Sequence, residues 1–357
     1  TALIHPYAGF LSGCVSATVG FAAPIALASL TFGISLATAF PFLPAKATAT
    51  TLIVLMVLIH TRTYRESSRG QYLLTLLKLA LIAAFVVTAF TAGNDFSHQV
   101  TGASLIDASE VLSGAGAIAL IYVTYAYSGW NAATYILGEL EHPQRDLPRA
   151  LIVGCALVTL LYVLLNSAFL TSASISSMTG EVEIAFIVAE TVLGASGAFV
   201  VSLLLSGVLI STVSAMIMAG PRALQRLGED YQGLPWLGKT NEGGLPSNAF
   251  VFMGLVALVF LWTSTFEQIL LFAGLVMAAN TFFTVVAVFI SRRRRAIDPE
   301  GRSMFTMPWY PVPALIFLAI TGWTVLYTAI QYPLQLLATA LLITLGYPLF
   351  QRLRSSY

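Results

Sequence analysis

The chain has 357 residues, of which 57% are hydrophobic and only 9% are charged, whereas soluble domains carry about 25% charged residues. This composition excludes a water-soluble fold. The formal net charge is +1, so no overall basic field would attract nucleic acid, and we expect no nucleic-acid partner. The two cysteines, Cys14 and Cys155, lie within apolar runs, which argues against a disulfide framework or a zinc site.

Long stretches of the chain carry no charged residue: 49 residues over 303–351, and 31 residues over each of 150–180 and 191–221. A helix needs about 20 apolar residues to cross a bilayer. Apolar windows predict ten membrane helices, in chain order 9–32, 47–60, 72–91, 109–141, 148–171, 196–219, 248–263, 268–290, 309–330 and 333–350. Because these windows are longer than barrel strands, and backbone groups inside a bilayer must bond within their own segment, we expect an all-α, polytopic membrane protein.

The basic residues are distributed unevenly between the two sides of the predicted membrane. If successive connections alternate sides, 15 of the 17 lysines and arginines fall on one side, Lys46 falls on the other, and Lys78 lies inside a span. The positive-inside rule makes the crowded side cytoplasmic. We therefore expect an integral protein of the inner or plasma membrane, with both ends of this chain cytoplasmic and no obligate protein partner.

The sequence offers little support for enzyme chemistry. Residues 233–240 match the phosphate-binding pattern GxxxxGK[ST], but no strand precedes them, and Pro235 and Trp236 occupy the middle. The four histidines form no HExxH pattern, and no GxSxG pattern is present. We expect no enzymatic activity, no cofactor and no bound metal.

Lys78 lies seven residues into the predicted span 72–91, among apolar residues. A cationic side chain inside a membrane is costly, so such a lysine normally faces a polar cavity or partner and marks an ion or substrate path. The alternative is that its long aliphatic stem carries the ammonium group toward the cytoplasmic headgroups. Position alone leaves both interpretations open.

The fourth window, 109–141, is too long for one ordinary crossing, and Ser128 and Gly129 lie near its middle beside Asn131. A break there would free the last carbonyl groups of the outer half-helix, whose negative dipole end suits a cation or an ammonium group. Glycine also serves close helix packing in membranes, so the Ser-Gly pair alone is weak evidence. The excess length favours a broken, ligand-binding helix.

Residues 127–151, YSGWNAATYILGELEHPQRDLPRAL, closely resemble the sixth helix and following loop of amino acid permeases of the amino acid-polyamine-organocation superfamily. Residues 6–16 resemble the entry to the family's third helix, and 211–222 resemble the end of its eighth. Lys78 matches a lysine typical of the fifth helix in several branches. The resemblance covers nearly all of 6–295.

The resemblance implies a fold. Members have twelve helices, of which the first ten form a five-plus-five inverted repeat, the leucine-transporter-like fold. The ten predicted spans then correspond to helices three to twelve: residues 1–291 would form the transporter core with an incomplete first repeat, and 292–357 a basic cytoplasmic loop with two C-terminal membrane helices. We expect the first two helices to be absent from this sequence, and the chain as given not to transport.

The resemblance also implies a binding site. The substrate α-ammonium group would be held by the carbonyl groups of Tyr125, Ala126 and Ser128, in a sixth helix broken at Gly129. The Tyr125 ring would form a gate above the site, and a side-chain pocket would be lined by Trp130 and Asn131.

Lys78 gains a specific role from the resemblance. Its ammonium group would replace the sodium ion that sodium-coupled relatives hold between their first and eighth helices, and its fixed charge would repel Na⁺. The implied function is sodium-independent, secondary active transport of neutral or cationic amino acids by alternating access, through proton symport or exchange. The partners implied are an amino-acid substrate, the lipid bilayer and, for symport, protons.

Two other functions are compatible with the same residues. One is a carrier for polyamines or other organic amines, which would not need a site for a carboxylate. The other is a membrane subunit that senses a ligand without transporting it, which would bind the ligand but produce no isotope flux.

The predicted topology can be tested with single cysteines placed at Gly93 and Gly301 in an intact protein from which Cys14 and Cys155 have been removed. The alternating map predicts that a membrane-impermeant thiol reagent labels the first from outside intact cells and the second only after permeabilisation. Labelling of both positions from the same face would contradict the map.

Overall fold

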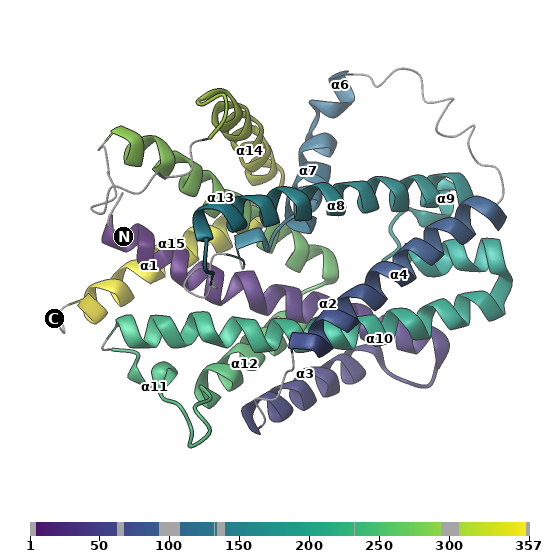
Figure 1. The fold of residues 1–357 in the computed structure, drawn as a ribbon, viewed down its shortest axis with the longest axis horizontal. Coiled ribbons are helices and arrows are strands. Elements are labelled where there is room, and N and C mark those ends of the chain that lie inside the picture. The colour runs from purple at the N-terminus through teal and green to yellow at the C-terminus, as the bar shows by residue number, and fades with distance from the viewer. Residues whose placement is uncertain are drawn as a thin grey trace.

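The computed structural model describes residues 5–62, 68–92, 108–131, 133, 140–231, 233–293 and 307–354. All regular structure in these ranges is helical, and they contain no strand (Figure 1). The helices are α1 (Pro6–Ala17), α2 (Val19–Ala39), α3 (Ala45–Arg62), α4 (Ser68–Ala92), α6 (Ala108–Val111), α7 (Gly114–Ala126), α8 (Pro143–Ser172), α9 (Ile175–Met178), α10 (Ile184–Asp230), α11 (Pro235–Gly238), α12 (Ser247–Thr263), α13 (Phe266–Arg293), α14 (Val312–Gln331) and α15 (Pro333–Arg354).

Eight helical segments among the described residues are long and apolar enough to cross a membrane: the continuous pair α1–α2, and α3, α4, α8, α10, α13, α14 and α15. The predicted all-helical membrane protein is therefore confirmed. The count of ten spans is met only in part, because the windows 109–141 and 248–263 correspond to the shorter apolar helices α7 and α12. Much of the inner half of 109–141 lies outside the described residues, as do Gly93 and Gly301.

Helix α10 differs most from its predicted window, 196–219. It is 47 residues long and contains a kink at Gly194, whose φ of 71° and ψ of −177° are not helical. Glycine reaches this conformation without the steric cost that a side chain would add. The kink separates a short first segment from the longer segment that contains the predicted span.

The bundle is built around α2, which is the most buried of the membrane helices and packs closely against α10. A Cβ atom added at Gly220 on α10 would lie 2.9 Å from the Phe21 Cβ on α2 and 2.9 Å from the Met253 Cε on α12. The missing side chain at Gly220 lets three helices approach one another, as small residues do in membrane proteins generally.

Contacts near the helix ends agree with the predicted alternation. The Phe10 ring on α1 lies 4.9 Å from the ring of Tyr231 after α10 and 5.5 Å from that of Phe350 on α15, so these three expected cytoplasmic ends meet on one side (Figure 1). At the other end of α2, the Ser35 hydroxyl donates a hydrogen bond to the Glu183 carboxylate before α10. Both of these residues belong to the expected outer side.

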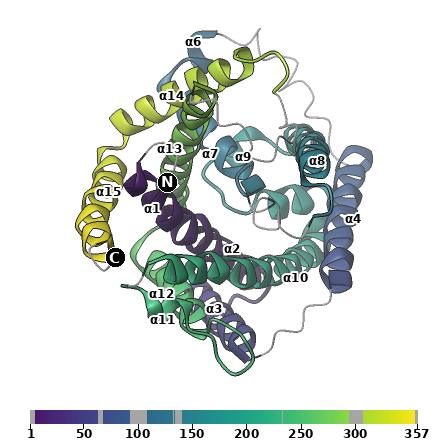
Figure 2. The ribbon, with the colours of Figure 1, turned by 60° about the vertical axis from the view of Figure 1, so that its left-hand side comes forward.

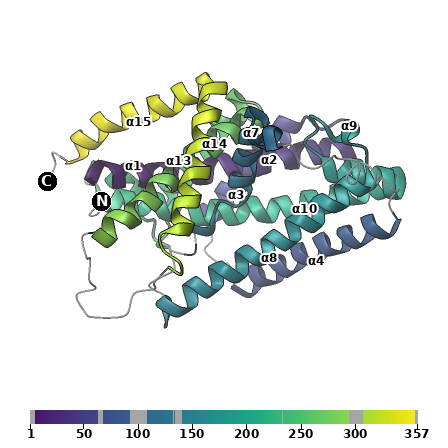
Figure 3. The same ribbon diagram turned by 90° about the horizontal axis from the view of Figure 1, so that it is seen from above.

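Helices α4 and α8 lie side by side along one flank of the molecule (Figures 2 and 3). Helix α7 packs instead against α13 and α14, where Ile121 is fully buried with Leu271 and Ala278. A Cβ at Gly274 on α13 would lie 2.6 Å from the Ile121 Cγ2, so this glycine lets α13 lie close to α7. These contacts fix α7 up to its last turn, and the residues that follow α7 reach α8.

Candidate functional site

Helix α7 ends in the middle of the predicted fourth window. It stops at Ala126, where the Tyr127 N–H donates to the Val123 carbonyl at 3.0 Å and the Ser128 N–H to the Tyr125 carbonyl at 2.9 Å. Gly129 follows with φ +96°. This left-handed conformation strongly favours glycine and ends the α-helical hydrogen bonding. The predicted break at the Ser-Gly pair is confirmed.

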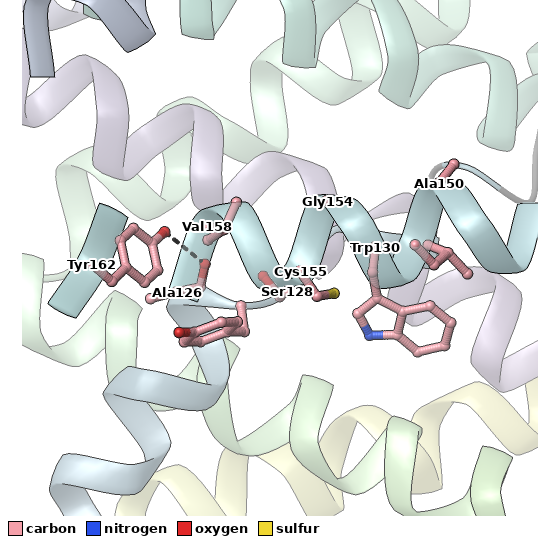
Figure 4. Close-up of a pocket in the computed structure, with 10 residues that line it drawn as sticks. Ala126, Ser128, Trp130, Ala150, Gly154, Cys155, Val158 and Tyr162 are labelled. Carbon is pink, nitrogen blue, oxygen red and sulfur yellow. Dashed lines mark hydrogen bonds between the residues drawn. The ribbon is translucent and has the colours of Figure 1, made fainter. Parts of the chain in front are cut away.

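A cavity of about 350 Å³ lies between this break and α8 (Figure 4). This volume is at the small end of the range for ligand pockets. Its walls come from the break and from residues 150–162 of α8, and none of the lining residues is charged. They are Ala126, Tyr127, Ser128, Trp130, Ala150, Leu151, Gly154, Cys155, Val158 and Tyr162.

Two tyrosines connect the break to α8. The Tyr162 hydroxyl donates a hydrogen bond of 3.0 Å to the Ala126 carbonyl (Figure 4). The Tyr127 hydroxyl donates to the Thr159 hydroxyl at 3.1 Å, and the two tyrosine rings pack edge to face with centroids 5.2 Å apart. Residues 159 and 162 share one face of α8 because they are three positions apart. The hydrogen bonds and the aromatic contact of these two tyrosines therefore hold the break against α8.

The structure brings some of the predicted substrate-binding residues together at this cavity. Ala126, Ser128 and Trp130 line it. Gly129 supplies the left-handed turn between them, and Asn131 follows Trp130 in a short 3₁₀ turn. The assignment of these residues to substrate binding stays a prediction.

Tyr125 lies apart from the cavity lining. Its side chain packs against the apolar cluster formed by α1, α2 and α13, which includes Val19 and Ala273. Its hydroxyl is buried and has no hydrogen-bond partner among the described residues. The Tyr125 ring, which was expected to form a gate above the site, therefore packs against α1, α2 and α13 in this structure. The backbone of Tyr125 belongs to the break.

Lys78 reaches from α4 to α10. Its half-buried side chain donates a hydrogen bond of 3.2 Å from Nζ to the Thr212 Oγ1, and the Thr212 hydroxyl in turn donates to the Val208 carbonyl at 3.0 Å. The ammonium group is therefore turned toward a polar partner on the helix that resembles the family's eighth. The assignment of Lys78 to the place of a sodium ion stays a prediction.

A second polar contact on α10 was not identified from the sequence. The buried His60, at the end of α3, lies 2.9 Å from the Ser214 hydroxyl through its Nε2, two residues beyond Thr212. Its ring stacks on that of Phe250 with an interplanar angle of 7°. From the sequence, His60 lies near the end of a predicted span. Its burial could not be predicted there because it depends on contacts with other helices.

A family model described as amino acid permease matches residues 1–345. The chain belongs to the amino acid permease family. This family consists of membrane transporters rather than enzymes, in agreement with the sequence analysis.

Several curated relatives align with the chain. It is 27% identical over 268 residues to the b(0,+)-type amino acid transporter 1 of Oryctolagus cuniculus, covering 72% of this chain and 54% of the relative. It is 26% identical over 317 residues to the serine/threonine exchanger SteT of Bacillus subtilis, covering 86% and 70%. It is 25% identical over 277 residues to the branched-chain amino acid permease BcaP of Lactococcus lactis, covering 75% and 58%. The chain thus spans about half the length of the b(0,+)-type relatives.

Proposed function

We propose that this protein transports neutral amino acids across the cell membrane by alternating access, without sodium. We propose further that it binds them at the break that follows α7. The observation that carries the proposal is this break at a cavity of ligand size. The C-terminal end of α7 presents carbonyl groups and the negative end of its dipole. Discontinuous membrane helices bind the charged groups of transporter substrates in this way.

The chemistry of the cavity favours a substrate with an uncharged side chain. Carbonyl groups at Ala126 and Ser128 suit the α-ammonium group, whereas the walls offer no charged residue to pair with a second charge. An unpaired charge in a membrane interior is strongly unfavourable. Trp130 and Val158 instead offer apolar contact area. The names of SteT and BcaP describe transport of serine, threonine and branched-chain amino acids by those proteins, which supports neutral substrates here.

Lys78 supports sodium independence. Its ammonium group already donates to Thr212 on α10, so a sodium ion close to the same oxygen would meet a fixed positive charge. At 4 Å and an effective dielectric constant of 20, that repulsion is about 4 kcal/mol. Transport would instead be driven by protons or by exchange for a second amino acid.

We propose an orientation in the membrane from the uneven distribution of lysines and arginines between its two sides. The ends of α1, α10 and α15 that meet around Phe10 would face the cytoplasm, and the contact between Ser35 and Glu183 would face outward. We further propose that residues 1–291 form the transporter core, with family helices three to ten. Residues 292–357 would add a basic cytoplasmic loop and two C-terminal membrane helices.

Cys155 allows a direct test of the binding site because its exposed thiol lines the cavity. In an intact Cys14→Ser protein, we expect saturating L-leucine or L-serine to slow alkylation of Cys155 by N-ethylmaleimide several-fold, since the bound amino acid occupies the space beside the thiol. Incorporation of labelled reagent measures the rate. We also expect alkylation to block uptake of the same amino acid.

Two controls accompany this test. 4-Methylpentanoate has the leucine side chain and carboxylate but no ammonium group, and should give no protection. Uptake by a Cys155→Ser variant should resist the reagent. If L-leucine and L-serine are taken up but neither protects Cys155, then the substrate does not bind in this cavity.

A Lys78→Ala variant tests the role of the intramembrane charge. We expect it to lose most amino-acid uptake at equal protein in the membrane, whereas Lys46→Ala, which removes the lysine near Trp262 at the outer end of α3, keeps most uptake. Wild-type uptake should be unchanged when choline replaces Na⁺. Full uptake by Lys78→Ala would favour a lysine that only reaches toward the headgroups, and sodium-dependent wild-type uptake would contradict the charge-replacement role.

A further inference from the structure

We propose that the Tyr162 hydroxyl and the substrate ammonium group compete for the Ala126 carbonyl, and that substrate binding displaces the hydroxyl from it. The inference rests on the proposed function and adds to it a residue of α8 that regulates the same site. It begins from the hydrogen bond of 3.0 Å between these two groups, both of which belong to residues that line the cavity (Figure 4).

Ala126 is the last residue of α7, and its carbonyl needs a donor from elsewhere. In an uninterrupted helix it would accept a hydrogen bond from the N–H four residues later, but the chain leaves the helix at Tyr127. A carbonyl without a partner inside a membrane is costly. The Tyr162 hydroxyl is the donor that meets this need in this structure.

The substrate has a stronger donor for the same acceptor. A phenol is neutral, whereas an α-ammonium group is charged, and hydrogen bonds from charged donors are shorter and stronger than those between neutral groups. The ammonium group also lies more favourably at the negative end of the α7 dipole. Replacing the Tyr162 hydroxyl with the ammonium group is therefore favourable at this carbonyl.

The Tyr162 hydroxyl can leave the Ala126 carbonyl while other contacts still hold the break against α8. The Tyr127 hydroxyl remains bonded to Thr159 on α8, and the edge-to-face contact of Tyr127 with the Tyr162 ring does not require the Tyr162 hydroxyl. Displacement would remove one hydrogen bond between α8 and the break. Substrate binding would thereby weaken the attachment of α8 to the break. A transporter needs such coupling if its helices are to move only after the substrate has bound.

A Tyr162→Phe variant tests this competition. It keeps the ring but removes the group that the substrate must displace, so we expect the intact protein to bind L-leucine or L-serine about three- to tenfold more tightly than wild type, the range that one net hydrogen bond produces. Binding of the labelled amino acid to purified protein measures the dissociation constant. The matched control is Tyr7→Phe, which also removes a tyrosine hydroxyl that donates to a backbone carbonyl, that of Ile343 on α15, but away from the cavity lining; its affinity should stay within twofold of wild type.

The gain should depend on the ammonium group. In competition with labelled L-leucine, 3-methylbutylamine should bind the Tyr162→Phe variant more tightly than wild type, whereas 4-methylpentanoate, which lacks the ammonium group, should not. A purely structural role for Tyr162 would weaken all three alike. Unchanged or weaker L-leucine binding by Tyr162→Phe overturns the inference while leaving the proposed function in place.

Two other results also bear on the inference. If Tyr162→Phe does not reach the membrane, Tyr162→Leu removes the same hydroxyl and carries the same expectation of tighter binding. If wild type itself neither binds nor takes up any amino acid, the proposed function fails, and the inference fails with it.

Discussion

The structure depends on one constraint, which is that a backbone carbonyl inside a membrane needs a hydrogen-bond donor. Helix α7 ends at Ala126, so several carbonyls near its end lose the donors of the next turn. The Ser128 N–H supplies a donor to the Tyr125 carbonyl, and the Tyr162 hydroxyl supplies one to the Ala126 carbonyl. These two carbonyls therefore have partners at the break, and one of the partners belongs to another helix.

The rest of the bundle positions this break. Gly274 lets α13 pack closely against α7, which fixes the helix as far as its last turn, and the pair of tyrosines fixes the turn against α8. Lys78 joins α4, which lies beside α8, to α10. The intramembrane lysine and the α8 wall of the cavity therefore lie on neighbouring helices.

The sequence predicted the helical membrane fold and the break at Gly129, because apolar length and a glycine are local signals, whereas the role of Lys78 stays a prediction. The sequence did not identify the α8 wall, because the window 148–171 was interpreted only as an apolar span. A signal was present: Cys155, Thr159 and Tyr162 recur at spacings of four and three and so share one face of that helix. The side chain of Tyr125 could not be placed from sequence, because its packing against α2 and α13 depends on tertiary contacts.

A structure of the intact protein with L-leucine or L-serine bound would show whether the break holds the substrate. We expect the amino acid to lie between the end of α7 and α8, with its ammonium nitrogen within hydrogen-bond distance, about 2.7–3.2 Å, of a carbonyl oxygen at Tyr125, Ala126 or Ser128. An amino acid bound elsewhere, with these carbonyls still bonded only within the protein, would contradict this expectation.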